Sequence, residues 1–348
     1  MAKKRKSSRK SKKGLKKWKQ LNFIGRVWRV IWVGALALWG FSIFQVLFCA
    51  VFNPPVTPLM VQRFFQQWKD PDRVVRFERD YVPIERISPN LVNAVVVSED
   101  GLYMYHRGFA VRSMKSAYIM NKKGKKVRGG STISQQTAKN CFLPHTRSMV
   151  RKAAEAYYTV LIEAVWGKER IMECYLNVIE FGDGIYGCEA ASQHYFGHSA
   201  EHLTTREAAL LAVCLPTPLR SNPGRPSSYL NRQSSTIQHR MSYYGKVDFD
   251  AKREDLNPKY LKMIDDESLW DFVWWMVTEG RKMEVSQPAS GGSKPSGTHR
   301  HRTSQPAPQP AEEVLEIEES GIEDLYGIDE SSAPMETPAP AEGNEEIN

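Results

Sequence analysis

The chain has 348 residues, a formal net charge of +9 at neutral pH and 41% hydrophobic residues. Its composition changes sharply along the sequence, so its length alone would overcount its domains. A basic head, an apolar stretch and an acidic tail leave residues 55–283 as the part that can form one sizeable core. These properties exclude a chain built of several comparable globular domains.

A basic head precedes an apolar stretch. Residues 1–29 contain many lysines and arginines and no acidic residue, which is compatible with a nucleic-acid-binding arm. The next stretch favours a membrane instead, because residues 30–52 contain no charged residue. A helix of this length, at about 1.5 Å per residue, crosses a hydrocarbon core of about 30 Å. We therefore predict one transmembrane anchor at residues 30–52 and no nucleic acid as a partner.

The charge distribution also predicts the orientation of the anchor. A secretory signal peptide has a shorter apolar run, of about 7 to 15 residues, and a small-residue cleavage site, and neither fits well here. Lysine and arginine concentrate on the cytoplasmic side of membrane anchors. Residues 1–29 are therefore predicted to be cytoplasmic, and the chain after Pro54 is predicted to lie outside the cytoplasm.

The C-terminal segment, residues 284–348, differs from the globular block. Gln, Pro, Ser and Gly follow in quick succession up to His301, and all charged residues after Arg302 are acidic. So few apolar residues cannot offset the entropy that is lost on ordering. We predict a disordered Pro/Ser-rich acidic tail, and favour a solvated linker over a binding site for a basic partner.

The cysteines outside the predicted anchor stand at positions 141, 174, 188 and 214. They show no C-x-x-C spacing, so they do not indicate a metal site. Four cysteines permit three disulfide pairings, and the sequence cannot choose between them. Because a block of this size does not depend on disulfides, we favour small buried thiols over a disulfide framework.

The globular block has a helical pattern. Apolar residues recur at helical spacing in residues 155–166 and again in residues 170–179. Thr204 and Glu207 have the spacing of a capping box, and the helix that they begin should end near Leu215, because prolines follow. Few segments alternate convincingly between apolar and polar residues. The fold is therefore predicted to be mainly α.

Two glutamates lie in dense polar motifs. Glu99 begins the sequence EDGLYMYHRG of residues 99–108, and Glu155 ends the sequence RKAAE of residues 151–155. Two carboxylates downstream of a membrane anchor suggest acid/base chemistry on a sugar that is joined to a membrane-held phosphate. Asp100 could help to fix the position and the pKa of Glu99. The alternative for Glu99 is a carboxylate that caps a helix end.

Between the glutamates lies a turn rich in Gly, hydroxyl and amide groups, RGGSTISQQ at residues 128–136. Ser131 and Gln136 supply donors and acceptors of the kind that hold sugar hydroxyls or phosphate oxygens, although an ordinary turn that caps a helix would look similar. Cations that a diphosphate leaving group would require stand nearby. They are Lys139, Arg147, Arg151 and Lys152. A solvated charged face is the plain alternative for these cations.

Four motifs in this order closely resemble those of the family 51 peptidoglycan glycosyltransferases. They are residues 99–108, 129–136, 151–155 and 168–177, and residues 237–241 correspond to a weaker last motif. The resemblance covers roughly residues 55 to 245. Tyr103 stands where the family usually has Phe, and Ser134 where it usually has Thr. Each substitution keeps the ring or the hydroxyl, so we expect an active protein.

The resemblance implies roles for single residues. Glu99 matches the general base that deprotonates the 4-hydroxyl of the acceptor sugar, which then attacks the donor anomeric carbon with inversion. Glu155 matches a second catalytic carboxylate that assists departure of the lipid diphosphate, directly or through a divalent cation. The other matched residues are implied to bind the substrate. They are Ser131, Gln136, Lys139, Arg147, Arg151 and Lys152.

The resemblance also implies a fold, partners and a location. The fold would be lysozyme-like and helical, with a small membrane-proximal subdomain between the first two motifs. The substrate would be lipid II and the product a nascent glycan strand, with membrane lipids and cell-division or elongation proteins as candidate partners. A divalent cation, Mg or Mn, is compatible with this chemistry, and no organic cofactor is expected. The location would be the bacterial inner membrane, with the catalytic domain periplasmic.

The sequence of the subdomain agrees with this location. Residues 109–120 are apolar with basic residues interspersed, and a lysine cluster follows them. Such a segment suits an anionic lipid surface. A plain basic loop is equally compatible with the pattern.

Alternatives of other classes also remain. Residues 246–348 contain neither Ser-x-x-Lys nor Lys-Thr-Gly, so no transpeptidase activity is expected. A lytic enzyme that cleaves the same glycan could share the fold, but would not need the pair of Lys139 and Arg147. A noncatalytic membrane scaffold would not need Glu99 and Glu155.

Overall fold

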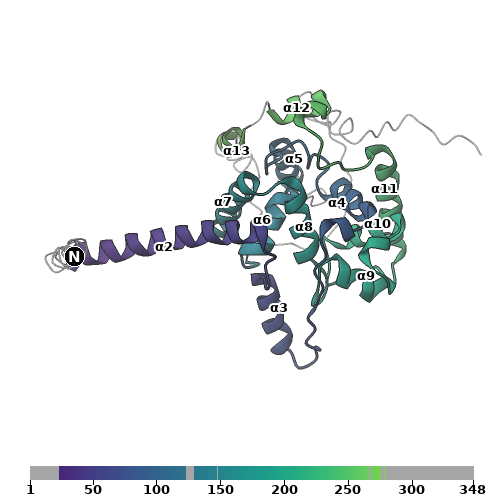
Figure 1. Ribbon diagram of the computed structural model, residues 1–348, viewed down its shortest axis with the longest axis horizontal. Coiled ribbons are helices and arrows are strands. Elements are labelled where there is room, and N and C mark those ends of the chain that lie inside the picture. Colours follow the sequence, from purple (N-terminus) through teal and green to yellow (C-terminus); the bar gives the residue numbers. More distant parts are fainter. Residues whose placement is uncertain (1–22, 123–128, 147, 266–267, 276–277, 279–348) are drawn as a thin grey trace, which may run out of the picture. The chain divides into compact units, whose positions relative to one another are not determined.

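The computed structural model describes residues 23–122, 129–146, 148–265, 268–275 and 278 (Figure 1). Most of these residues are helical, as predicted. The α-helices are α2 Phe23–Val51, α3 Pro58–Trp68, α4 Pro89–Glu99, α5 Val111–Lys122, α6 Ile133–Phe142, α7 Met149–Val165, α8 Lys168–Val178, α9 Cys188–Phe196, α10 Thr205–Cys214, α11 Ser228–Tyr244, α12 Pro258–Asp265 and α13 Leu269–Trp275. The predicted tail, most of the basic head and Arg147 lie outside the described residues.

Short elements connect the α-helices. The 3-10 helices are η1 Ile84–Arg86, η2 Ala200–His202 and η3 Arg253–Asp255, and the strands are β1 Glu78–Arg79, β2 Glu180–Gly182 and β3 Ile185–Tyr186. The strands form one small sheet in the order β1-β3-β2, in which β1 is parallel and β2 antiparallel to β3. Strands of two or three residues are too short to produce an alternating pattern, so they could not be predicted from the sequence.

Helix α2 is long and apolar enough to cross a membrane and contains nearly all of the predicted anchor. Only 11% of its most apolar window is buried, unlike a core helix. Its C-terminal part packs against α7, where Ser42 Oγ and Tyr157 OH lie 2.8 Å apart and Tyr158 OH donates to Gln45 Oε1 at 3.1 Å. A single-pass membrane anchor is thus docked on the globular part by polar contacts.

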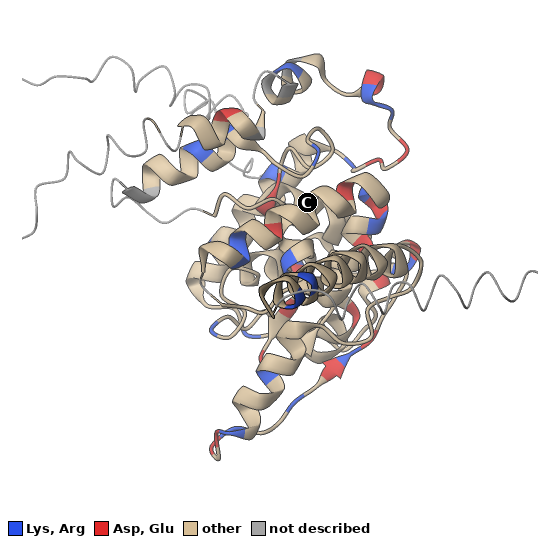
Figure 2. Cartoon of the chain, turned by 90° about the vertical axis from the view of Figure 1, so that its left-hand side faces the viewer, with Lys and Arg blue, Asp and Glu red and all other residues tan. Residues whose placement is uncertain are grey.

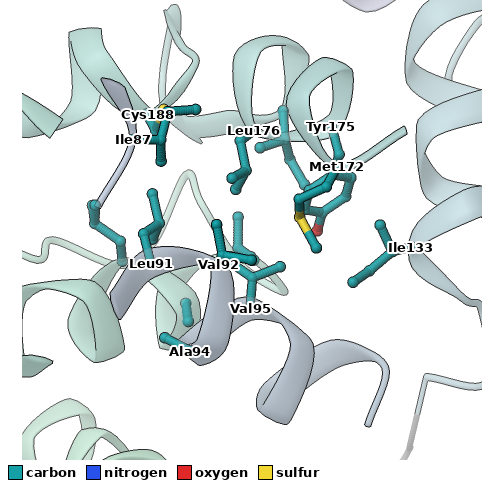
Figure 3. Packing of buried hydrophobic residues seen from close by; sticks show 14 of the residues in the cluster. Ile87, Leu91, Val92, Ala94, Val95, Ile133, Met172, Tyr175, Leu176 and Cys188 are labelled. Atoms are coloured by element: carbon teal, nitrogen blue, oxygen red, sulfur yellow. The ribbon is translucent and has the colours of Figure 1, made fainter. Parts of the chain in front are cut away.

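The core is built around α4, which is buried on almost all sides from Leu91 to Val97. It packs against α10 and α11. Its apolar side chains also face Met172 and Leu176 of α8 and Ile133 of α6 (Figure 3). Because α4 ends at Glu99, the first of the two motif glutamates stands where the helix leaves the core.

The structure confirms the capping box that the sequence predicted. Thr204 caps α10 together with Glu207, and the helix ends before Leu215, as predicted. Thr132 and Gln135 form a capping box that begins α6, which bears out the alternative interpretation of residues 128–136 as a turn that caps a helix. The cysteines of the described residues are buried and free, which confirms the preference for small buried thiols.

Candidate active site

Glu99 is half-buried at the end of α4 and faces Gln136 of α6. Gln136 Nε2 donates a hydrogen bond of 2.8 Å to Glu99 Oε2, and Gln136 Oε1 accepts one of 3.3 Å from Tyr175 OH. Burial raises the pKa of Glu99, and the Asp100 charge acts in the same direction. The Gln136 hydrogen bond and Lys139 oppose that rise. A carboxylate with a raised pKa is a better proton acceptor than an ordinary glutamate.

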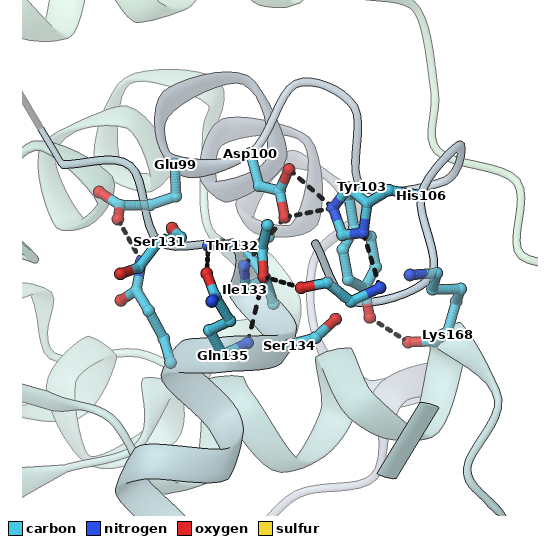
Figure 4. Close-up of polar contacts among 12 residues, drawn as sticks. Glu99, Asp100, Tyr103, His106, Ser131, Thr132, Ile133, Ser134, Gln135 and Lys168 are labelled. Atoms are coloured by element: carbon cyan, nitrogen blue, oxygen red, sulfur yellow. Dashed lines mark hydrogen bonds and ion pairs between the residues drawn. The ribbon is translucent and has the colours of Figure 1, made fainter. Parts of the chain in front are cut away.

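Asp100, next to Glu99, holds the polar loop of residues 99–108 against α6 (Figure 4). Both of its carboxylate oxygens lie within 3.0 Å of His106 Nε2, and Oδ2 also accepts a hydrogen bond of 2.9 Å from Ile133 N. His106 Nδ1 accepts from Gly108 N at 3.0 Å, which assigns the ring proton to Nε2. Asp100 therefore positions the site, as the sequence suggested, and its oxygens are not directed at a ligand.

The first turn of α6 is joined to the same loop. Thr132 Oγ1 donates to Gly108 O at 2.7 Å while accepting from Gln135 N at 3.2 Å. Gly108 has a φ of 91°, and a Cβ atom there would lie 2.7 Å from Thr159 Cγ2 of α7. Only glycine fits such a position without strain. The motifs of residues 99–108 and 129–136 thus meet at Gly108, against α7.

A second polar chain links these motifs to α8. Ser134 Oγ donates to Glu163 of α7, and Lys168 Nζ forms an ion pair of 2.7 Å with the same carboxylate. Tyr103 is fully buried, and its hydroxyl donates to Lys168 O at 2.6 Å (Figure 4). Both residues that depart from the usual family pattern therefore use their hydroxyl groups in this chain.

Glu155 lies buried on α7, where Arg151 and Lys152 of the preceding turn both form ion pairs with it. Lys152 Nζ also donates to Ser131 Oγ at 3.2 Å, which ties α7 to the loop before α6. Lys139 projects from the same helix as Gln136. Burial lowers the pKa of Lys139, while Glu155 and more weakly Glu99 raise it, so this cation lies in the field of both glutamates.

The arrangement brings two kinds of group to α6 and the loop before it. Gln136 of α6 contacts Glu99, a carboxylate with a raised pKa, and Ser131 contacts Lys152, one of the cations that Glu155 orients. The structure brings together every candidate residue that it describes. Arg147, the remaining candidate, lies outside the described residues. A base near several cations suits a reaction in which a hydroxyl loses a proton while an anionic group departs.

Comparison with known proteins supports this interpretation. The family model described as Transglycosylase matches residues 69–242. A protein of Shewanella oneidensis named "Biosynthetic peptidoglycan transglycosylase" is 44% identical over 218 residues, which are 62% of this chain and 92% of the relative. Proteins with the same name from Caulobacter vibrioides and Pseudomonas fluorescens are 48% and 41% identical over 53% and 60% of this chain, and 77% and 86% of their own lengths.

The chain belongs to the transglycosylase family. It is therefore a glycosyltransferase enzyme, as its motifs predicted. The matched region begins after α3 and ends within α11, so it contains Glu99, Glu155 and every other candidate residue. The membrane anchor and α3 lie outside it.

A pocket that sequence reasoning did not assign adjoins Glu99 of the candidate transglycosylase site. A cavity of about 470 Å³ opens beside Glu99 between α4, α10 and α11. Its polar lining includes Arg220, Tyr229, Gln233 and Arg240. Arg240 lies in the weak last motif, which is the only sequence signal that pointed here. Guanidinium, phenol and amide groups beside a base suit a polar saccharide.

The described side chains of the candidate site do not form a metal-binding site by themselves. Among the described residues, no group of three or more His, Cys, Asp or Glu side chains is placed to hold an ion. Glu155, the carboxylate that the resemblance links to a divalent cation, already forms ion pairs with Arg151 and Lys152. These residues alone do not fit a resident divalent cation, which takes several oxygen ligands.

Proposed function

We propose that this chain polymerises lipid II into glycan strands and releases undecaprenyl diphosphate, as a biosynthetic peptidoglycan transglycosylase. The family membership and the names of the relatives support the peptidoglycan substrate. The observation that carries the proposal is the position of Glu99, which lines a pocket with several polar side chains and has its pKa raised by burial. The cations that pair with Glu155 reach the loop before α6, where Lys152 contacts Ser131, while Gln136 of α6 contacts Glu99.

In the proposed reaction, Glu99 accepts the proton of the acceptor 4-hydroxyl. The oxygen attacks the anomeric carbon of the donor as the bond from that carbon to the diphosphate oxygen breaks, so the configuration inverts. Lys139, Arg147, Arg151 and Lys152 would stabilise the charge on the departing diphosphate. Glu155 would hold two of these cations in place, and Ser131 and Gln136 would contact the bound sugar or phosphate.

We propose a divalent cation, Mg or Mn, only as an ion that binds together with the substrate. Because Glu155 already pairs with Arg151 and Lys152, most ligands of such an ion would come from the diphosphate and from water. No step of the proposed mechanism runs through it. The proton transfer at Glu99 and the charge stabilisation by lysine and arginine need only groups of this chain.

We further propose that α2 spans the bacterial inner membrane with the N-terminus in the cytoplasm and the globular part in the periplasm. The basic residues that precede the apolar stretch support this orientation. A catalytic domain held at the outer face would meet a substrate carried by the membrane. Recruitment by cell-division or elongation proteins would then occur in the same compartment.

Incubation of the purified full-length protein with fluorescent lipid II tests the function. Products are separated by length on a gel, with Mg²⁺, with Mn²⁺ and with a chelator. A ladder of glycan strands that disappears in Glu99→Gln is the expected result. The absence of a ladder, together with release of fragments from preformed glycan, would overturn polymerisation in favour of a lytic reaction.

A further inference from the structure

Helix α3 turns Arg63 and Gln67 toward the protein, together with the buried Leu59 and Met60 at its start. Arg63 of α3 forms a two-point contact with Glu180 of β2, through hydrogen bonds of 2.8 and 2.7 Å, and this carboxylate is buried. Gln67, also buried, donates to Asp183 Oδ1 at 2.8 Å and accepts from Arg76 N at 3.0 Å. These contacts fix which face of the helix points inward.

The outward face of α3 is apolar. Its residues are Val61, Phe64, Phe65 and Trp68, which are 45%, 43%, 48% and 66% exposed. They stand at the i, i+3, i+4 and i+7 positions that form one stripe along a helix. A helix at the surface of a soluble protein has the opposite arrangement, with its apolar stripe toward the core. In Figure 2 the ribbon of α3 accordingly carries little charge along most of its length.

The position of α3 in the chain limits what can cover this stripe. Only residues 52–57 separate the end of the membrane anchor α2 from the start of α3. Such a connection spans at most about 25 Å even when it is fully extended. It is also held to the globular part, because Arg79 Nη2 donates to Pro54 O at 2.6 Å and Arg79 Nη1 donates to Pro55 O. The stripe therefore stays close to the surface of any membrane that α2 crosses.

We propose that α3 is an interfacial helix, whose stripe of Val61, Phe64, Phe65 and Trp68 inserts into the outer leaflet of the membrane beside the anchor. Aromatic rings, tryptophan above all, favour the boundary between headgroups and acyl chains. A helix that lies flat there buries its apolar face by about 5 to 10 Å. Two attachments, α2 and α3, would then fix the tilt of the globular part over the membrane, which a single anchor cannot do.

This proposal does not depend on the catalytic reaction. The transglycosylase match begins at residue 69, after the end of α3, so the stripe lies outside the part of the chain that defines the family. The proposal rests instead on the exposed apolar stripe of α3 and on the closeness of α3 to α2. A protein partner or a second copy of the chain would be the other occupants of an apolar stripe.

Single-cysteine labelling of the full-length protein can separate these occupants. The native cysteines are buried, so an environment-sensitive fluorophore should react mainly with a cysteine introduced at Val61→Cys or Phe65→Cys. Ser235→Cys on α11 is the exposed control, and Gln66→Cys reports the flank of α3. Each variant is reconstituted into vesicles of phosphatidylethanolamine and phosphatidylglycerol that contain lipids with a nitroxide just below the headgroup.

We expect the lipid nitroxide to quench labels at positions 61 and 65 several-fold more than the label at position 235, with position 66 between them. Quenching at 61 and 65 no greater than at 235 would overturn the proposal. A label at 65 that is shielded from water but not quenched by the lipid would instead identify a protein partner or a second copy. Each variant is first compared with the unaltered protein by circular dichroism, which confirms that it is folded.

Discussion

Gln136 lies between Glu99 and Tyr175, donating to the carboxylate through Nε2 and accepting from the phenol through Oε1. This chain of contacts fixes which end of the amide faces the base. It also gives Gln136 a second role beside the predicted contact with substrate. A donor to a carboxylate stabilises its charged form, so Gln136 limits how far burial can raise the pKa of Glu99.

Replacing Gln136 by Ala should therefore shift the acidic limb of the pH–rate profile. Without the donor, the pKa of Glu99 rises further, and the base becomes protonated at a higher pH than in the unaltered enzyme. At low pH the variant should be slower than the unaltered enzyme. Well above the raised pKa of Glu99, the rates of the two enzymes should differ less. The measurement is kcat/KM for lipid II against pH, because this quantity reports groups of the free enzyme. If the acidic limb of the profile lies at the same pH in the variant and in the unaltered enzyme, Gln136 does not affect the pKa of Glu99.

Glu99→Gln should remove activity and leave the fold more stable near neutral pH. Loss of a general base typically costs about 10² to 10⁴ in rate. The pKa of Glu99 is higher in the folded than in the unfolded chain, so its contribution to stability is present below the unfolded pKa and is lost as pH rises through the folded one. The amide in Glu99→Gln does not ionise, so the variant does not lose this stability as the pH rises. Thermal unfolding of the variant and the unaltered protein at pH 7 and pH 4 tests this expectation. The variant should be the more stable protein at pH 7 but not at pH 4.

Lys139→Arg should extend activity to higher pH. Burial lowers the pKa of Lys139, so this cation loses its proton at a lower pH than an exposed lysine would. Arginine keeps its charge throughout. If Lys139 binds the diphosphate, the unaltered enzyme should lose activity on the alkaline side, and the variant should lose less of it. Lys139→Met is the matched control and should be poorly active at every pH.

The sequence located this site well because its chemistry is local. Residues 99–108 and 151–155 each place charged and polar groups within a few positions, so the motifs could be recognised without the fold. Contacts between motifs could not be derived, and the bond from Ile133 N to Asp100 is an example. Helix α4 was also missed, because a helix that is buried all round has no amphipathic periodicity. Helix α3 was also missed, although Val61, Phe64, Phe65 and Trp68 have helical spacing in the sequence. That this stripe is exposed could not be derived, because it depends on how the helix packs.

Asp100→Asn tests whether the loop of residues 99–108 depends on this carboxylate. The amide oxygen can replace Oδ2, which accepts from both His106 Nε2 and Ile133 N. The amide nitrogen in the place of Oδ1 is a donor, however, and would face the Nε2 proton of His106. A buried group without its partner costs about 1 to 3 kcal/mol. We expect a loss of unfolding free energy in that range, together with a lower kcat. Unchanged stability would show that the contacts of Asp100 are replaceable.

Tyr103→Phe isolates the hydroxyl that this chain has added to the usual family pattern. The hydroxyl donates to Lys168 O in the buried interior, and the ring would remain in place after the substitution. Loss of a buried hydrogen bond of this kind should lower the free energy of unfolding by about 1 kcal/mol, as measured by denaturant titration in detergent.

Because Lys168 also pairs with Glu163, which accepts from Ser134, Tyr103 and Ser134 belong to one polar chain. We expect the double variant of Tyr103→Phe and Ser134→Ala to lose less stability than the two single variants added together, since the second change acts on a chain that is already broken. Strict additivity would indicate that the two hydroxyls act independently. Activity should change little in Tyr103→Phe, because its hydroxyl faces α8 and makes no contact with Glu99 or Gln136.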